Sequence, residues 1–203
     1  EARCFLEARP GGTAYLDACG ANTFDLSVSG VARLRSDNSA AAAPGYQAAI
    51  TDLGIQVEEG TVGGVPVLWV TPPHVSGTEK ILYTFGGAFI VGQPEDDISI
   101  FAPLAVALER RVCAPRYRRA PEHPFPAGRD DVMAVYRALT SDGSGVLVVG
   151  ESAGGNLALG LMLGAANAGD LPLPKAVALL SPWIDLSHGG DSHATLAYVD
   201  PTL

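Results

Sequence analysis

The sequence predicts an α/β fold with a mostly parallel sheet that helices cover on both faces. Short apolar runs of strand length alternate along the chain with helix-compatible segments, which is the order that βαβ units produce. Most of these runs are apolar at every position, as in strands that are buried on both faces of a sheet. The chain has 203 residues and is 47% hydrophobic, so it is long enough for one buried core.

Two regions differ in how clearly the sequence defines them. Residues 1–54 are expected to form an N-terminal cap or lid segment, and residues 55–203 an α/β core that is truncated at its C-terminal end. Within the cap, Ala40–Ala43 stands just before Pro44 and indicates a helix end or a linker. Tyr46–Leu53 is again compatible with a helix. Because this region shows no catalytic pattern, we expect it to pack over the core.

The core begins with three predicted strands. Ile55–Glu58 alternates between apolar and polar residues, as a half-exposed strand does. The turn at Gly63-Gly64 connects it to Val65–Val70, so the two strands are expected to form a hairpin. Lys80–Phe85 is a third strand of mostly apolar residues.

Helices and strands then alternate. Asp97–Arg110 predicts a helix, with a kink or a start near Pro103. Val112–Pro115 predicts a fourth strand, and Ala127–Thr140 predicts a helix with one apolar face. Towards the end of the chain, Ala176–Leu180 predicts another buried strand.

The segment Gly150–Asn156 separates an apolar strand, Val146–Val149, from an apolar helix that continues to about Ala168. It contains the pattern Gly-x-Ser-x-Gly, which in a strand–turn–helix context predicts a nucleophile elbow with Ser152 as the catalytic nucleophile. So sharp a turn strains the serine backbone, and the residues two positions away on each side must be small. The alternative interpretation is an ordinary glycine-rich turn, but the flanking strand and helix favour the elbow.

A second glycine pair, Gly86-Gly87, directly follows the third strand. Ester hydrolysis places negative charge on the former carbonyl oxygen, and this charge needs N–H donors at fixed positions. In such folds the donors come from the loop after the third strand and from the residue after the nucleophile. The sequence therefore predicts an oxyanion hole formed by the amides of Gly86, Gly87 and Ala153.

Four segments in this order resemble motifs of the hormone-sensitive-lipase-like family of α/β-hydrolase esterases. The resemblance covers about residues 60–203, and its motifs are Phe85–Phe89, Tyr117–Ala127, Gly150–Asn156 and Leu180–Ser187. It implies the α/β-hydrolase fold with an N-terminal helical cap. It also implies hydrolysis of short-chain acyl esters, a small-molecule substrate and no cofactor or metal.

Four positions depart from the family pattern. Phe85 stands where the family has a histidine that steadies the oxyanion loop, and Glu151 stands in place of an aspartate. Arg116 and Arg119 replace an aspartate and a leucine and bring two positive charges into one segment. With Arg118, these arginines are expected to pair locally with acidic neighbours, namely Glu122, Asp130 and Asp131.

The sequence lacks a clear base for the nucleophile. A serine needs a histidine and an orienting carboxylate, which in the resembling family follow the Ser-Pro-Trp segment by some distance. Because the sequence stops at Leu203, we expect that region to be absent and the chain to be a fragment of an esterase of roughly 300 residues. Asp185 with His188 or His193 would have the right order for a relocated triad, but Asp185 does not match the family's catalytic acid.

The strand Ala176–Leu180 gives a physical reason for the same expectation. If the sheet ended there, this apolar run would be an uncovered edge, which native folds normally hide. The remaining histidines offer no base, since His123 lies in the Pro-Glu-His-Pro segment and His74 is expected to be solvated.

Composition and charge argue against several classes of binding partner and site. A net charge of −9 without a basic face argues against nucleic acid. Three cysteines without paired spacing suggest neither a zinc site nor a disulfide pattern, and no apolar run approaches the ~20 residues of a membrane span. No signal peptide is recognisable, so a cytoplasmic location is expected, and a homodimer is compatible with the sequence.

Two other functions fit the same residues. The resembling family also includes plant hormone receptors that keep the pocket and lose the histidine. The chain could therefore be a non-catalytic member that binds a small molecule. It could also be an inactive fragment that lacks the triad acid and histidine. Hydrolysis of an ester by the chain would exclude both alternatives and favour an esterase.

Overall fold

The computed structural model describes residues 25–187, 189–191 and 195. The chain divides into two compact units, one formed by Val31–Ile184 and the other by residues 1–30 with 185–203. The larger unit holds the whole sheet and every residue of the predicted elbow and glycine loop.

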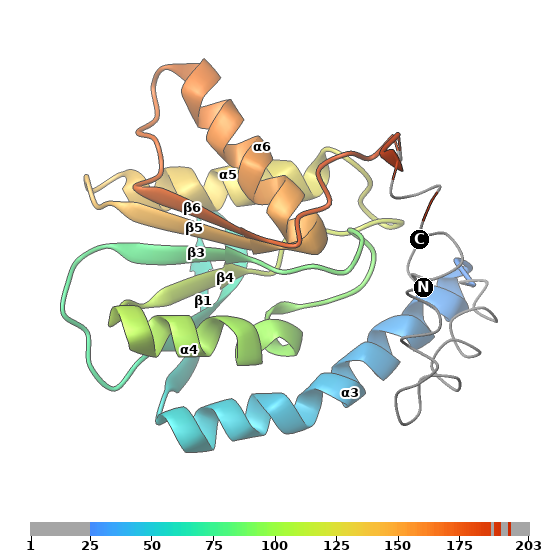
Figure 1. Cartoon of the computed structure of the whole chain (residues 1–203), viewed down its shortest axis with the longest axis horizontal. Coiled ribbons are helices and arrows are strands. Elements are labelled where there is room, and N and C mark those ends of the chain that lie inside the picture. Colours follow the sequence, from blue (N-terminus) through green and yellow to red (C-terminus); the bar gives the residue numbers. More distant parts are fainter. Residues whose placement is uncertain (1–24, 188, 192–194, 196–203) are drawn as a thin grey trace. The chain divides into compact units, whose positions relative to one another are not determined.

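A six-stranded sheet forms the larger unit, in the order β1-β2-β4-β3-β5-β6 (Figure 1). The hairpin of β1 and β2 is antiparallel, as is the pair of β2 and β4. The pairs β3–β4, β3–β5 and β5–β6 are parallel, so the predicted α/β fold is confirmed. The strands are β1 (Gln56–Val62), β2 (Val65–Thr71), β3 (Lys80–Thr84), β4 (Val112–Pro115), β5 (Val146–Glu151) and β6 (Ala176–Leu180).

Helices cover both faces of this sheet. Figure 1 shows α4 on one face, and α5 and α6 on the other. The helical segments are α3 (Val28–Leu53), the 3₁₀ turn η1 (Pro94–Asp97), α4 (Ile98–Leu108), α5 (Ala127–Thr140) and α6 (Ser152–Ala168). The bounds of β4, α5 and β6 are those that the apolar patterns predict.

The cap differs from the prediction. Instead of a helix end or a linker before Pro44, one helix of 26 residues, α3, runs through this proline. A proline inside a helix removes a hydrogen bond, so contacts on both sides must offset the loss. Arg35 donates to the carbonyl oxygen of Ile90 on one side, and Ala49 is buried in the core on the other. In the core, α4 also starts before Pro103 and contains it.

The middle of the sheet is the most buried part of the unit. In β3, every side chain from Ile81 to Thr84 is inaccessible to solvent. By contrast, β6 lies at the edge of the described sheet and pairs with β5 alone. None of its residues is buried and Leu180 is 36% exposed, so the prediction of a buried strand is wrong for β6 in the described sheet, because no further strand or helix covers this edge there. The ends of β3 and β5, where the predicted site lies, therefore belong to strands in the buried middle of the sheet.

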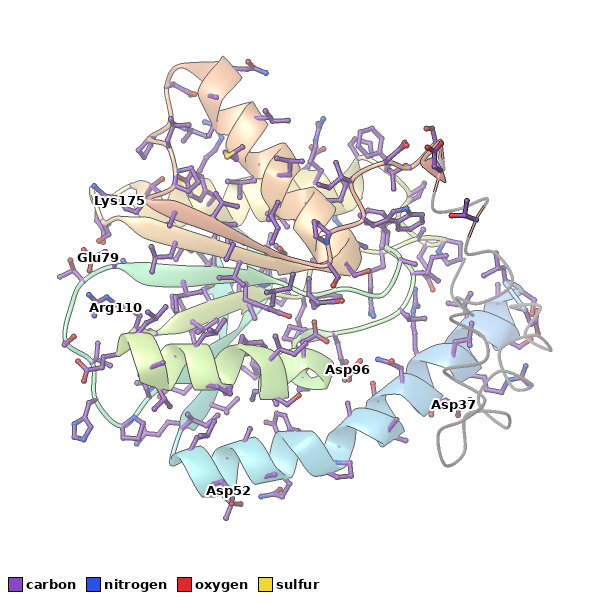
Figure 2. The ribbon with its side chains drawn as sticks, in the orientation of Figure 1. Asp37, Asp52, Glu79, Asp96, Arg110 and Lys175 are labelled. Atoms are coloured by element: carbon purple, nitrogen blue, oxygen red, sulfur yellow. The ribbon has the colours of Figure 1, made fainter. Side chains whose placement is uncertain are left out.

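Charged groups gather at the opposite end of the strands. Figure 2 shows Glu79, Arg110 and Lys175 together where β3 begins, and Arg110 pairs with Glu79 at 3.2 Å. Among the described residues, no helix is both long and apolar enough to cross a membrane. The same residues contain no cluster of histidine, cysteine or acidic side chains that could hold a metal ion.

Candidate active site

Strand β5 turns into helix α6 within a single residue. Glu151 still has extended backbone angles (φ −109°, ψ 137°), and Ser152 then has a φ of +49° as the first residue of the helix. For a residue with a side chain this left-handed conformation is uncommon and strained. The structure thus confirms the strained backbone that the glycine spacing predicts for Ser152.

The glycines around Ser152 are required by close backbone contacts. A Cβ atom at Gly154 would overlap the carbonyl oxygens of Thr84 and Phe85, and it would lie 2.5 Å from the carbonyl carbon of Thr84. A Cβ atom at Gly150 would lie 2.7 Å from the Thr84 hydroxyl oxygen. That hydroxyl donates a hydrogen bond of 2.8 Å to the Gly154 carbonyl oxygen. The start of α6 is therefore fastened directly onto the end of β3.

The exit of β6 is fastened to the same turn. The amide of Trp183 donates to the carbonyl oxygen of Ser152 at 2.9 Å, and the side chain of Asn156 donates to the carbonyl oxygen of Trp183 at the same distance. The last residue of the Gly-Glu-Ser-Ala-Gly-Gly-Asn motif therefore has a structural role. Ala153 is the second residue of α6, so its N–H has no acceptor within the helix and lies at the positive end of the helix dipole.

The glycine loop lies directly against the elbow. Thr84 at the end of β3 pairs with Gly150 at the end of β5. A Cβ atom at Gly86 would lie 3.1 Å from the Cβ atom of Ser152. The structure thus brings together the two glycine segments that the sequence analysis singled out, although they are more than sixty residues apart.

Three successive residues of the loop have left-handed backbone angles. Their φ values are +103° at Gly87, +54° at Ala88 and +61° at Phe89. The turn is closed by the amides of Ile90 and Val91, which both donate to the Gly87 carbonyl oxygen at 2.9 Å. Since two of these three residues carry side chains, the loop is strained where it faces the elbow.

The amides of this loop are not equivalent. The N–H of Gly86 donates to the Asp97 carboxylate at 3.3 Å, so it already has an acceptor. Within the part of the chain that the structure describes, the amides of Gly87 and Ala88 have no acceptor. Of the predicted donors, this leaves Gly87 and Ala153 available to a ligand. Ala88 is a further candidate that the sequence analysis missed, because nothing in an alanine signals its positive φ.

Phe85, the departure at the start of the loop, stacks on Tyr117. Their ring centroids are 4.1 Å apart with an interplanar angle of 12°, and the Tyr117 hydroxyl donates to the Phe85 carbonyl oxygen at 2.8 Å. Gly92 lies against the same ring, since a Cβ atom there would be 3.0 Å from it. The side chain that stands for a histidine therefore holds the loop by aromatic packing.

Two arginines hold the far end of the loop. Arg35 donates to the Ile90 carbonyl oxygen at 2.8 Å and forms a bidentate pair with Glu122. Arg119, one of the departures, donates to the carbonyl oxygen of Gly92. The unusual arginine thus contacts the loop and not the acidic neighbours that the sequence suggested.

The other arginines of this segment do form ion pairs. Arg118 pairs with Asp131 at 2.7 Å, as predicted. Arg116 pairs instead with Glu59, at 2.6 Å, and with Glu95. Its partners lie on β1 and η1, which are distant from Arg116 in the sequence. Local pairing was therefore the wrong expectation for Arg116.

Two carboxyl groups lie beneath the elbow. Burial, and then the charge of Asp97, raise the pKa of Glu151 to about 7. Burial also raises the pKa of Asp97, although its hydrogen bonds from Tyr83 and Gly86 oppose this shift. Glu151 therefore changes charge near neutral pH one residue away from Ser152.

No described histidine hydrogen-bonds to Ser152. His74 and His123 are both exposed, as expected for solvated or surface positions. Asp185 accepts hydrogen bonds from Ser187 and Gly189 within its own loop. His188 and His193, the alternative bases, lie outside the described residues. What the described structure brings together is the strained Ser152 and a set of amide donors.

Known proteins resemble the chain in both sequence and structure. The family described as the alpha/beta hydrolase fold matches residues 81–202. An acetyl-hydrolase of Streptomyces hygroscopicus is 39% identical over 138 residues, which is 66% of this chain and 46% of that protein. A versiconal hemiacetal acetate esterase of Emericella nidulans is 31% identical over 139 residues, 68% of this chain and 49% of that protein. The chain thus spans about half the length of these curated relatives.

Solved structures agree with the sequence relatives. An esterase from the bacterial hormone-sensitive lipase family has a TM-score of 0.79 and 30% identity, over 94% of this chain and 62% of that one. A hormone-sensitive lipase from a metagenome library has a TM-score of 0.81 and 30% identity, over 99% of this chain and 64% of that one.

Proposed function

Because the chain belongs to the alpha/beta hydrolase family and is similar to hormone-sensitive-lipase esterases, we propose that it carries the nucleophile side of a carboxylic-ester hydrolase. The proposed substrates are short-chain acyl esters, and the proposed intermediate is an acyl-enzyme on Ser152. The observation that carries this proposal is the strained Ser152, which lies at the start of a helix and against a loop with amides that have no acceptor.

In the proposed reaction, the Ser152 hydroxyl attacks the acyl carbon as a base removes its proton. Negative charge then develops on the carbonyl oxygen. The N–H groups of Gly87 and Ala153 stabilise this charge, with Ala88 as an added donor. The alcohol leaves with a proton, and water later hydrolyses the acyl-enzyme. Because the Gly86 amide already donates to Asp97, its proposed role is to hold the loop in place.

A base and an orienting carboxylate complete such a mechanism. No described histidine contacts Ser152, and this observation favours a second candidate, a small-molecule-binding member of the family without turnover. Both candidates would bind a ligand at Ser152 and the neighbouring amide donors, and they differ in whether an ester bond is cleaved. Turnover therefore distinguishes them directly.

The test is hydrolysis of p-nitrophenyl acetate and butyrate by the protein and by two serine variants. We expect release of p-nitrophenol by the wild type, and loss of it in Ser152→Ala. Ser99→Ala is the matched control, since Ser99 is exposed on α4 and distant from the elbow in sequence. Equal rates in the wild type and Ser152→Ala would refute the esterase proposal. Tight ligand binding without turnover would support the second candidate instead.

A further inference from the structure

Asp97 occupies a position where its side chain would normally serve a helix. It is the N-cap residue of α4, and aspartate there usually accepts a hydrogen bond from the first turn. Here the side chain makes no capping hydrogen bond. The carboxylate therefore makes its hydrogen bonds away from the first turn of α4.

Those contacts are with β3 and with the glycine loop. Oδ2 of Asp97 accepts a hydrogen bond of 2.9 Å from the Tyr83 hydroxyl and one of 3.3 Å from the Gly86 amide. Tyr83 is wholly buried in the middle of the sheet, and its ring packs against Phe101 of α4 at 4.6 Å. The carboxylate thus connects a fixed point in the core to the first glycine of the loop.

Glu151 closes the other side of Gly86. A Cβ atom at Gly86 would overlap Oε2 of Glu151, so this residue lies between the two carboxyl groups. The charged group that acts on Asp97 is Asp96, and the charged group that acts on Glu151 is Asp97. None of these is a cation, so the buried charge of Asp97 depends on its two hydrogen bonds.

Phe85 explains why this anchor matters here. A phenylalanine side chain has no polar atom, so a polar contact that holds the start of the loop must come from another residue. We propose that Asp97 is a positioning residue that fixes the glycine loop through the Gly86 amide. The inference rests on the proposed function for its catalytic consequence, but its structural part is independent of turnover.

The first arm of the test measures hydrogen exchange at the Gly86 amide by NMR. In Asp97→Ala we expect exchange to be faster by about tenfold or more, because a hydrogen bond to a charged group is lost. Asp96→Ala is the matched control. Figure 2 shows Asp96 at the end of α4 that faces α3, and its carboxylate accepts from Asn38 at 2.6 Å. Unchanged exchange at Gly86 in Asp97→Ala would overturn the proposal.

The second arm measures p-nitrophenyl butyrate hydrolysis. Asp97→Ala is expected to lower kcat about tenfold or more with little change in KM, because the loop acts on the transition state. Asp97→Asn keeps an oxygen that can accept from Gly86, and it should recover a large part of kcat. Equal losses in both variants, or an equal loss in Asp96→Ala, would contradict a positioning role. If the wild type has no turnover, the esterase proposal fails and the exchange arm alone decides the Asp97 inference.

Discussion

The turn at Ser152 and the glycine loop Phe85–Gly92 meet at Gly86, but they are held by opposite means. At the elbow, Gly150 and Gly154 lack side chains, and this absence lets α6 approach β3 closely enough for backbone contact. In the loop, four side chains from three different parts of the chain contact the backbone and hold it in place. They are Arg35, Asp97, Tyr117 and Arg119.

The difference has a physical consequence. Steric contacts between backbones allow little adjustment, so an added methyl group at the elbow should be very costly. Hydrogen bonds from side chains each contribute about 0.5–1.5 kcal/mol, so the loop should respond to their loss in small steps. The turn at Ser152 is therefore expected to tolerate almost no added atoms. The loop geometry, in contrast, should change gradually as single hydrogen bonds are removed.

The largest effect is expected at Gly154. Gly154→Ala should lower the free energy of unfolding by about 3 kcal/mol or more, since its Cβ atom would overlap two carbonyl oxygens. Gly160→Ala is the control in the same helix, where no atom lies within 4 Å of the added carbon. It should stabilise the helix by up to about 1 kcal/mol. Urea denaturation measures the unfolding free energy of both variants. If both changes lowered it, or both raised it, the steric explanation would be refuted.

A smaller effect is expected from the hydroxyl that joins the two regions. Thr84→Val keeps the shape of the side chain but leaves the Gly154 carbonyl oxygen without its 2.8 Å donor. We expect a loss of about 1–3 kcal/mol in unfolding free energy, because the site is wholly buried. Thr61→Val on the exposed part of β1 should stay within about 0.5 kcal/mol of the wild type. Equal stability of both variants would show that this hydrogen bond does not hold the elbow.

A contact that holds the loop from outside is that of Tyr117. Tyr117→Phe keeps the stack on Phe85 and removes the hydroxyl that donates to the Phe85 carbonyl oxygen. The expected loss is about 1 kcal/mol. Tyr136→Phe removes a comparable bond, to the Pro172 carbonyl oxygen at 2.7 Å, away from the site. Both variants should lose stability, but only Tyr117→Phe should slow the reaction of Ser152 with an organophosphonate. Equal slowing in both would mean that the effect is global.

The smallest effect concerns pH. Because the pKa of Glu151 is raised from 4.5 to about 7, the folded chain binds this proton more tightly than the unfolded chain. Its contribution to stability is therefore complete below about pH 4.5 and is lost as pH rises to about 7. Glu151→Gln should flatten this part of the stability profile relative to the wild type. Parallel profiles, measured by thermal unfolding across this range, would contradict the assignment.

Much of the fold followed from local patterns. Apolar runs and turn residues were sufficient for the bounds of β4, α5 and β6. For β4 and α5 the burial also follows the apolar pattern, whereas β6 is apolar but not buried in the described sheet. The cap was less predictable, since Pro44 argues locally for a break and only tertiary contacts of α3 override it. At the site, the glycine spacing predicted the strained Ser152.

The anchors of the loop could not be predicted in the same way. Asp97 reaches Gly86 only because α4 packs on β3, and Arg119 reaches Gly92 only because two loops lie side by side. Sequence separation hides both contacts. Gly86 illustrates this limit, since the structure places it against Ser152 but the sequence did not indicate that its amide donates to Asp97.

Covalent labelling tests whether Ser152 is the nucleophile that we propose. The protein is treated with an organophosphonate, and the adduct is located by intact mass and peptide mapping. We predict one adduct per chain, on Ser152, that is present in Ser99→Ala and absent in Ser152→Ala. An adduct on another residue, or no adduct in the wild type, would contradict it.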